Sequence, residues 1–324
     1  MTSKQAAKLE PKFRDKVRNV LEEQCGTPGA VKVLGGDKAE LASVRKGAVV
    51  YKRYCTQCHG TSGDGNGPAG RYMIPRPRDY RAGIFKFTST TYGAKPLRDD
   101  LIRTVRRGVM GTSMPSFDLL SKADLEAVVD YVLALTRRGE LESQLADAAE
   151  FDGDVDPARV PELIDGILKK WKAAPSQVVY PATPMPEFSA TTVQAGKAAF
   201  LSKGCSKCHG DDGRGQTKEN IGVDSWGNPT KAADLTSGML RGGTEPIDLY
   251  RHVDSGINGT PMPSFRSAFQ QEPETAWNLV SYVLYLSNRR RAGEVPEAGL
   301  LKPLPGVEPS SSAPAAESVS QLTR

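Results

Sequence analysis

The chain has 324 residues, of which 38% are hydrophobic and 25% are charged, and its formal net charge is +5. At about 100–200 residues per domain, this length predicts two domains, and the hydrophobic fraction is enough only for small cores. No run approaches the roughly 18 apolar residues of a membrane-spanning helix, and five Cys are too few for a disulfide scaffold. These numbers exclude a disulfide-rich scaffold and a chain built around membrane-spanning helices.

The first predicted elements are all helices. Residues 1–40 form an N-terminal extension with one amphipathic helix over Lys12 to Cys25. A further helix is expected over Ala42 to Tyr54, and another is expected to begin at Asp99, where acidic residues form the first turn. A third is expected over Ser121 to Arg138, where apolar residues recur at helical spacing. Alternating runs long enough for a sheet are absent from the sequence, so the predicted fold class is all-α.

The second half of the chain begins with a linker. Residues 140–190 contain a possible helix over Pro157 to Trp171, followed by a Pro-rich run that we expect to be extended and stiff. Helices over Thr192 to Ser202 and Glu274 to Arg290 are counterparts of two helices in the first half. The polar tail, residues 292–324, is expected to be disordered.

The two halves repeat each other, with five blocks in the same order at shifts of 148 to 151 residues. This repetition predicts two homologous domains, residues 41–139 and 191–291. The best-matched blocks are CTQCHG from Cys55 and CSKCHG from Cys205, GTSMPSF from Gly111 and GTPMPSF from Gly259, and VVDYVLAL from Val128 and LVSYVLYL from Leu279.

Each repeat contains CxxCH, the attachment site of c-type haem. Two thiols at this spacing reach the two vinyl groups of one haem, and the adjacent His lies under the ring as an iron ligand. A thioredoxin-like CxxC would sit in a βαβ unit, and a zinc site would need further ligands at finger spacing. We therefore predict two covalently bound haem c groups, held by Cys55, Cys58 and His59 and by Cys205, Cys208 and His209.

The repeat also selects a sixth iron ligand. Met114 lies 55 residues after His59, and Met262 lies 53 residues after His209, both within GTxMPSF. The following Pro restricts the Met backbone to an extended form, which suits a rigid loop over a haem face. Met with His is the ligand pair of electron-transfer cytochromes, so we predict Met114 and Met262 as axial ligands. The unmatched residues Met73, Met110 and Met239 are expected to fill space.

Charge is distributed unevenly along the chain. Residues 41–139 hold 17 Lys and Arg against 8 Asp and Glu (+9), residues 140–190 hold 4 against 10 (−6), and residues 191–290 hold 11 against 10 (+1). A basic first domain would attract an acidic redox partner; contact with anionic lipid, or a merely solvated face, stays open. No nucleic-acid reading motif accompanies the basic excess. Four arginines follow the first haem motif and are candidates for contact with haem propionates: Arg71, Arg76, Arg78 and Arg81.

On these motifs, both repeats resemble class I cytochrome c domains, and the whole resembles dihaem cytochromes c. The resemblance covers about 200 of the 324 residues. It implies that an N-terminal helix crosses a C-terminal helix through a small residue and aromatic rings. The residues that fit this crossing are Gly47 and Tyr51 facing Val128 and Tyr131, and Gly196 and Phe200 facing Leu279 and Tyr282.

The predicted function is electron transfer with His/Met-ligated irons, as a carrier or as a haem subunit of a respiratory complex with a membrane oxidase or dehydrogenase. The alternative is a dihaem oxidoreductase, such as a peroxidase or a thiosulfate dehydrogenase-like enzyme.

Two residues have open roles. His252 aligns with Thr104 and is a haem ligand or an ordinary surface or core residue; Cys25 is structural, a thiol ligand or a lipid attachment point.

The resemblance implies a location in the periplasm or on the outer face of the cytoplasmic membrane, because haem c is attached there. Residues 1–30 contain no apolar core typical of a signal peptide. We therefore expect an upstream segment, either a cleaved signal or a lipoprotein anchor, or a misassigned start.

Overall fold

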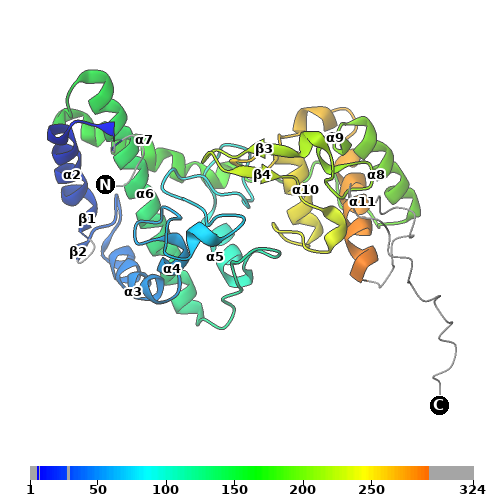
Figure 1. The fold of residues 1–324 in the computed structure, drawn as a ribbon, viewed down its shortest axis with the longest axis horizontal. Coiled ribbons are helices and arrows are strands. Elements are labelled where there is room, and N and C mark those ends of the chain that lie inside the picture. The colour runs from blue at the N-terminus through cyan, green and yellow to red at the C-terminus, as the bar shows by residue number, and fades with distance from the viewer. Residues whose placement is uncertain (1–5, 7, 28–29, 292–324) are drawn as a thin grey trace, which may run out of the picture.

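The computed structural model describes residues 6, 8–27 and 30–291, which form two lobes (Figure 1). The described residues are mostly helical, with two short antiparallel hairpins, which confirms the predicted all-α class. None of the described helices is both long enough and apolar enough to span a bilayer. The predicted disordered tail, residues 292–324, lies outside the described residues.

The first repeat is built around two long helices. Asp37 starts the first of them, because its side chain accepts a hydrogen bond from the Glu40 backbone N–H (2.9 Å) while the Glu40 carboxylate accepts one from the Asp37 N–H (3.2 Å). Ser121 caps the second through the Asp124 N–H (3.1 Å). The elements are α3 (Lys38–Tyr54), α4 (Thr56–His59), the 3-10 turn η1 (Gly70–Tyr72), α5 (Arg98–Arg107) and α6 (Lys122–Asp152).

Helices α3 and α6 cross at a glycine, as the resemblance implied. A Cβ atom added at Gly47 would collide with the Ala127 carbonyl and with Cβ of Tyr131. The rings of Tyr51 and Tyr131 pack beside this crossing with centroids 5.1 Å apart. Only a residue without a side chain allows the two backbones to come this close.

The second repeat reproduces this crossing. A Cβ atom at Gly196 would collide with the Asn278 carbonyl, and the rings of Phe200 and Tyr282 lie 5.4 Å apart. The elements are α8 (Ala190–Ser202), α9 (Ser206–His209), η4 (Lys218–Asn220), β3 (Ile221–Val223), β4 (Pro229–Lys231), η5 (Leu235–Ser237), α10 (Pro246–Ser255), η6 (Arg266–Phe269) and α11 (Glu274–Arg291).

The end of the helix predicted over Ser121 to Arg138 was wrong, because α6 continues to Asp152. Its second half packs against the N-terminal extension and α7, so residues 140–152 belong to a folded cluster. The members of this N-terminal cluster include Val17, Leu21, Leu141, Leu145 and Ile167, all at most 1% exposed. The remaining elements here are α2 (Pro11–Cys25), the hairpin β1 (Gly26–Thr27) and β2 (Ala30–Val31), η2 (Pro157–Arg159), α7 (Val160–Lys172) and η3 (Ala174–Gln177).

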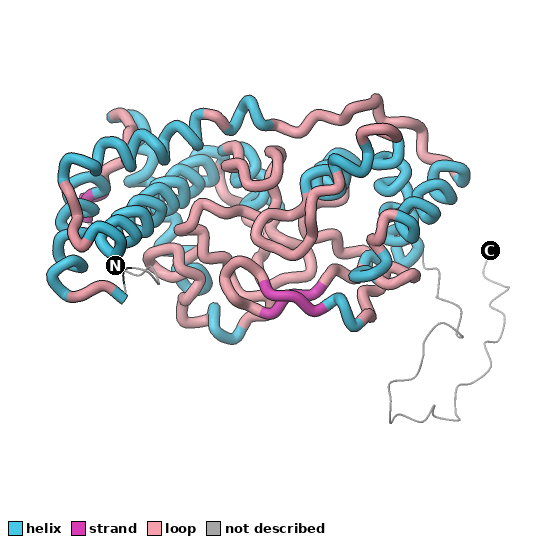
Figure 2. The backbone as a smooth tube through the Cα atoms, turned by 90° about the horizontal axis from the view of Figure 1, so that it is seen from above, coloured by secondary structure: helices cyan, strands magenta, loops and turns pink. Residues whose placement is uncertain are grey.

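Loops of the two repeats meet in the middle of the molecule, with helices on either side (Figure 2). Several hydrogen bonds cross this junction. The Trp226 ring N–H donates to the Asp79 carbonyl (2.7 Å), the Gly93 N–H donates to the Asn258 side chain (2.8 Å), and the Arg107 guanidinium pairs with Asp248 (2.9 Å). The two repeats are therefore in direct contact, which their repeat pattern alone does not predict.

Candidate functional site

The first CxxCH motif forms one tight turn at the end of α3. Cys55 follows the last residue of α3, and α4 spans only Thr56–His59. The His59 N–H donates to the Cys55 carbonyl (2.9 Å), so both thiols and the imidazole leave the backbone within a single turn. Gly60 ends the turn at φ +74°, a conformation that favours glycine.

Glycine then returns the chain past this turn. The Gly65 N–H donates to the His59 carbonyl (3.0 Å), and the Tyr80 N–H donates to the Gly63 carbonyl (3.2 Å). Gly63 has φ +78°, and a Cβ atom there would collide with the ring of Tyr80. Glycine at these positions is thus required by both backbone conformation and space.

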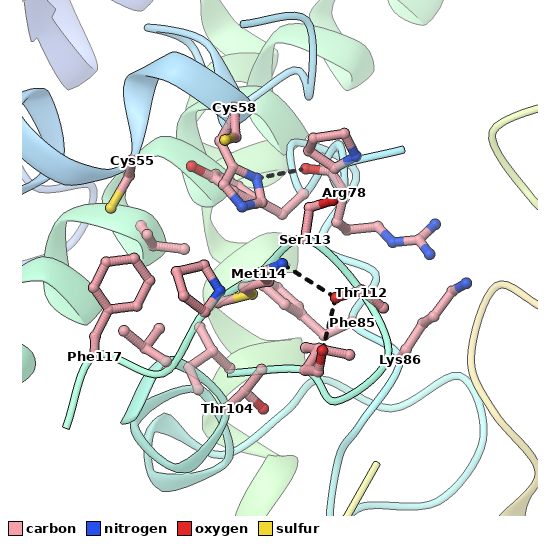
Figure 3. A pocket seen from close by; sticks show the side chains of 18 of the residues that line it. Cys55, Cys58, Arg78, Phe85, Lys86, Thr104, Thr112, Ser113, Met114 and Phe117 are labelled. Atoms are coloured by element: carbon pink, nitrogen blue, oxygen red, sulfur yellow. Dashed lines mark hydrogen bonds between the residues drawn. The ribbon is translucent and has the colours of Figure 1, made fainter. Parts of the chain in front are cut away.

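His59 is oriented by a backbone carbonyl. Its Nδ1 lies 3.2 Å from the Arg78 carbonyl oxygen, which can only accept a hydrogen bond (Figure 3). Nδ1 therefore carries the proton, and Nε2 keeps its lone pair for a metal. Burial lowers the pKa of His59, and the neighbouring Arg78 charge acts in the same direction, so the imidazole stays neutral. A neutral, oriented imidazole is the form that ligates iron.

The motif opens onto an apolar cavity of about 460 Å³. Cys55, Cys58 and His59 line it, and so does Met114 from the loop after α5 (Figure 3). Burial raises the pKa of the Cys55 thiol to about 12. The walls are mainly apolar side chains, which suit a large flat macrocycle: Tyr51, Phe85, Leu101, Val105, Val128, Val129 and Val132.

The Met114 loop is fixed by its own backbone. The Val109 N–H donates to the Met114 carbonyl (3.1 Å), and the Met114 N–H donates to the Thr112 hydroxyl (3.2 Å). Gly108 has φ +69°, and a Cβ atom there would lie 2.5 Å from Pro115. The loop thus holds Met114 at the cavity that CxxCH faces, and its thioether as the sixth ligand remains a prediction.

Two other methionines are not simple fillers. Met73 lines the same cavity as Met114, so the structure offers a second thioether there. Met239 is 50% exposed, and a Cβ atom on Gly111 would lie 3.5 Å from its sulfur. Neither has a counterpart in the other repeat, so the repeat pattern gave no signal for them.

The second CxxCH motif has the same local geometry. His209 Nδ1 lies 3.0 Å from the Ala233 carbonyl oxygen, so this imidazole also keeps Nε2 for a metal. The Gly215 N–H donates to the His209 carbonyl (2.6 Å), and burial lowers the pKa of His209. Cys205 is partly buried with its pKa raised to about 11, while Cys208 is exposed.

The Met262 loop repeats the main hydrogen bonds of the Met114 loop. The Ile257 N–H donates to the Met262 carbonyl (3.2 Å), and the Met262 N–H donates to the Thr260 hydroxyl (3.3 Å). Ser264 donates to the Asp254 carbonyl (2.7 Å), as Ser116 does to the Arg106 carbonyl (2.8 Å). The two loops share these hydrogen bonds, each in a repeat with CxxCH, and Met262 as an iron ligand remains a prediction, as for Met114.

Cations surround one side of the first cavity. Of the four arginines considered for haem propionates, Arg76 and Arg78 line it. Arg81 instead binds Asp79 through two nitrogens, and Arg71 packs over the Tyr72 ring. Sequence reasoning missed two further lining cations, Lys86 and Arg241, the second of which comes from the other repeat.

The two unassigned residues, Cys25 and His252, are both buried or partly buried. Cys25 is buried at the end of α2 within the N-terminal cluster, and burial raises its pKa to about 11. His252 packs on the ring of Phe87 from the first repeat, with centroids 5.7 Å apart. Its surroundings are those of a residue at the junction between repeats.

A mostly helical repeat that presents CxxCH and a methionine loop to one apolar cavity is the architecture of a c-type cytochrome domain. The family described as "Cytochrome C oxidase, cbb3-type, subunit III" matches residues 42–132 and 191–283, and the chain belongs to this family. Cytochrome c domains bind haem c covalently and transfer electrons. The chain is therefore a haem-binding electron-transfer protein, and the predicted resemblance to tandem cytochrome c domains is confirmed.

A solved structure is also similar to this chain. It belongs to a reducing HAO-like protein complex of Kuenenia stuttgartiensis, with 32% sequence identity and a TM-score of 0.58. The match covers 74% of this chain and 95% of that chain, so it extends over both repeats. A comparison with curated proteins finds no match.

Proposed function

We propose that the chain carries two haem c groups, one in each repeat, and relays single electrons between them. The observation that carries this proposal is the duplicated geometry: a CxxCH turn with an oriented imidazole, and a methionine loop closed by the same hydrogen bonds in both repeats. The proposed attachment cysteines are Cys55, Cys58, Cys205 and Cys208, and the proposed iron ligands are His59, Met114, His209 and Met262.

Haem c supplies a one-electron Fe(III)/Fe(II) couple when it is bound. The protein's part would be to hold the iron of each haem with His59 and Met114, or with His209 and Met262, whose backbones are fixed. A Met and His pair would leave no iron position for a substrate and would raise the reduction potential. Electron relay fits this constellation better than the alternative of a dihaem peroxidase or thiosulfate dehydrogenase-like enzyme, which would need an open or unusual sixth position.

The solved relative supports a role inside a larger assembly, because it is part of a complex with an HAO-like protein. We infer that this chain likewise exchanges electrons with a redox-protein partner, as a haem subunit. The chain would work in the periplasm or on the outer face of the cytoplasmic membrane, where haem c is attached. A redox partner that co-purifies with the chain would support the subunit role over that of a free carrier.

Axial ligation is tested by the near-infrared charge-transfer band of Met–Fe(III). The ferric protein should show this band for both haems, and Met114→Ala or Met262→Ala should each remove about half of its intensity and lower one midpoint potential. Met73→Ala is the matched control, because Met73 lines the same cavity as Met114, and it should leave the band unchanged. Loss of the band in Met73→Ala, with Met114→Ala unaffected, would reverse the assignment.

A further inference from the structure

Three of the cations that line the first cavity are partly buried or come from the other repeat. Arg78 and Lys86 come from the loop that follows the first CxxCH motif, and Arg241 comes from the second repeat. Figure 3 shows the side chains of Arg78 and Lys86 extending to the same side of the cavity, away from Cys55 and Phe117. We call Arg78, Lys86 and Arg241 the cationic cluster.

One carboxylate accompanies this cluster. Asp224 of the second repeat lies 3.5 Å from the Arg78 guanidinium, and its side chain is 8% exposed. Within the described part of the chain, no ion pair is formed by Lys86 or by Arg241. The cationic cluster and Asp224 thus set three positive charges against one negative, and Arg76, which also lines the cavity, adds to the positive excess.

This excess is unfavourable in a half-buried site. The pKa of Lys86 is lowered to about 8, chiefly by burial and also by the charges of Arg78 and Arg241, while Asp224 opposes the shift. Burial likewise lowers the pKa of Arg78 to about 10. Cations that are partly desolvated next to one another favour a bound anion. The two propionates of one haem are anions that would offset this positive excess.

The second repeat also holds Arg78 in place. The Arg78 guanidinium packs over the Trp226 ring, 3.6 Å from its centroid, and the Trp226 N–H bonds the neighbouring Asp79 carbonyl (2.7 Å). Arg78 thus contacts a cavity of the first repeat and two side chains of the second, Trp226 and Asp224. The carbonyl of the same residue orients His59.

We propose that the cationic cluster binds the propionates of the haem in the first repeat, so that the second repeat completes this haem site through Arg241. This inference rests on the haem c of the proposed function. It makes the first haem a structural link between the repeats, because its carboxylates would be shared by side chains of both. It also makes the potential of the first haem depend on a residue of the second repeat.

The test is Arg241→Gln in the full haem-loaded chain, with Lys197→Gln as a control. Lys197 is an exposed cation of the second repeat on α8, so its loss removes one charge away from the cavity. Removing a cation beside a haem favours the more positive ferric state. Spectroelectrochemical titration should show the potential of the first haem falling in Arg241→Gln, equivalent to about a threefold to tenfold change in its reduction equilibrium.

Several readouts separate the possible outcomes. The potential that Met114→Ala lowers identifies the first haem; if that variant lowers neither potential, the haem with the altered near-infrared band is the first. Arg241→Lys keeps the charge, so the potential of the first haem should stay close to its value in the unmodified protein. Lys86→Gln should lower the same potential that Arg241→Gln lowers. The inference is overturned if Arg241→Gln leaves both potentials unchanged, moves only the second, or matches Lys197→Gln. Failure of axial ligation is separate, because it would show as a missing near-infrared band in the unmodified protein.

Discussion

At the scale of single residues, glycine determines how closely the terminal helices of each repeat approach. Gly47 and Gly196 occupy equivalent positions, and a Cβ atom at either would collide with a backbone carbonyl of the partner helix. A backbone carbonyl cannot move aside as a flexible side chain can. The crossing therefore depends on a residue type that is otherwise unfavourable inside a helix.

Gly47→Ala should destabilise the first repeat by about 1–3 kcal/mol through overpacking, and should reduce haem incorporation there. Gly166→Ala is the matched control, because Gly166 lies inside α7 with no atom near a built Cβ. The control should stabilise α7 by about 0.5–1 kcal/mol. Thermal unfolding and haem absorbance of both variants measure the difference, and equal stability of the two would contradict the crossing argument.

The residues that sequence could predict are those with a counterpart in the other repeat. Met114 was selected because Met262 stands in the same heptapeptide, and the structure places Met114 at the cavity that CxxCH faces. Met73 lines this cavity without a counterpart, so no comparison within the chain could select it. Arg241 reaches the cavity only because the two repeats are packed together, and a repeat pattern does not contain that information.

At the scale of elements, α6 shows why a helix end is hard to place from sequence. Arg137, Arg138 and Gly139 look like a basic last turn followed by a C-terminal glycine. In the structure Gly139 lies inside the helix, where a Cβ atom would collide with Arg81. Leu141 and Leu145 continue the helical spacing beyond it and are buried against α2. The glycine is there for a close contact, and packing of the second half keeps the helix intact.

Leu145→Ala tests whether this cluster is a stable part of the fold. Leu145 is 1% exposed, so its truncation should cost about 2–4 kcal/mol and speed hydrogen exchange in α2. Leu119→Ala is the control, since Leu119 is fully exposed, and it should change little. Both haem potentials should stay unchanged in both variants. Unaltered exchange in α2 after Leu145→Ala would mean that the cluster contributes little to the fold.

At the scale of the whole molecule, part of the uneven charge of the sequence is paired internally. Glu140 from the predicted linker pairs with Lys95, and Glu142 pairs with Arg138 (3.2 Å). From the second repeat, Asp248 pairs with Arg107 (2.9 Å). Part of the +9 excess of the first repeat therefore faces the rest of the chain. Docking of a redox partner on the first repeat stays a prediction. Fewer cations of this repeat are unpaired, and so able to attract an acidic partner, than the sequence suggested.

The same junction makes stability depend on pH through His252. This imidazole packs on Phe87 of the first repeat, and burial is the main cause that lowers its pKa to about 4. The carboxylate of Asp248 opposes this shift, while the charges of three nearby arginines support it: Arg103, Arg107 and Arg251. A protonated His252 is therefore unfavourable in the folded junction.

The sign of the pH effect follows from linkage. An unfolded His binds a proton with a pKa near 6.5, whereas His252 in the folded chain resists protonation down to about 4. As the pH falls through this window, the unfolded state takes up the proton first, so stability is full above about pH 6.5 and is lost toward pH 4. Because His252 is partly exposed, we expect a loss of about 1–3 kcal/mol.

His252→Asn removes this titration and leaves the other histidines in place. Thermal unfolding of the second repeat, measured from pH 7 to pH 4, should therefore depend less steeply on pH in the variant than in the unmodified protein. Above pH 7 the two profiles should be parallel, because His252 is then neutral in both the folded and the unfolded state. Profiles that stay parallel down to pH 4 would show that His252 is protonated as easily in the junction as in the unfolded chain.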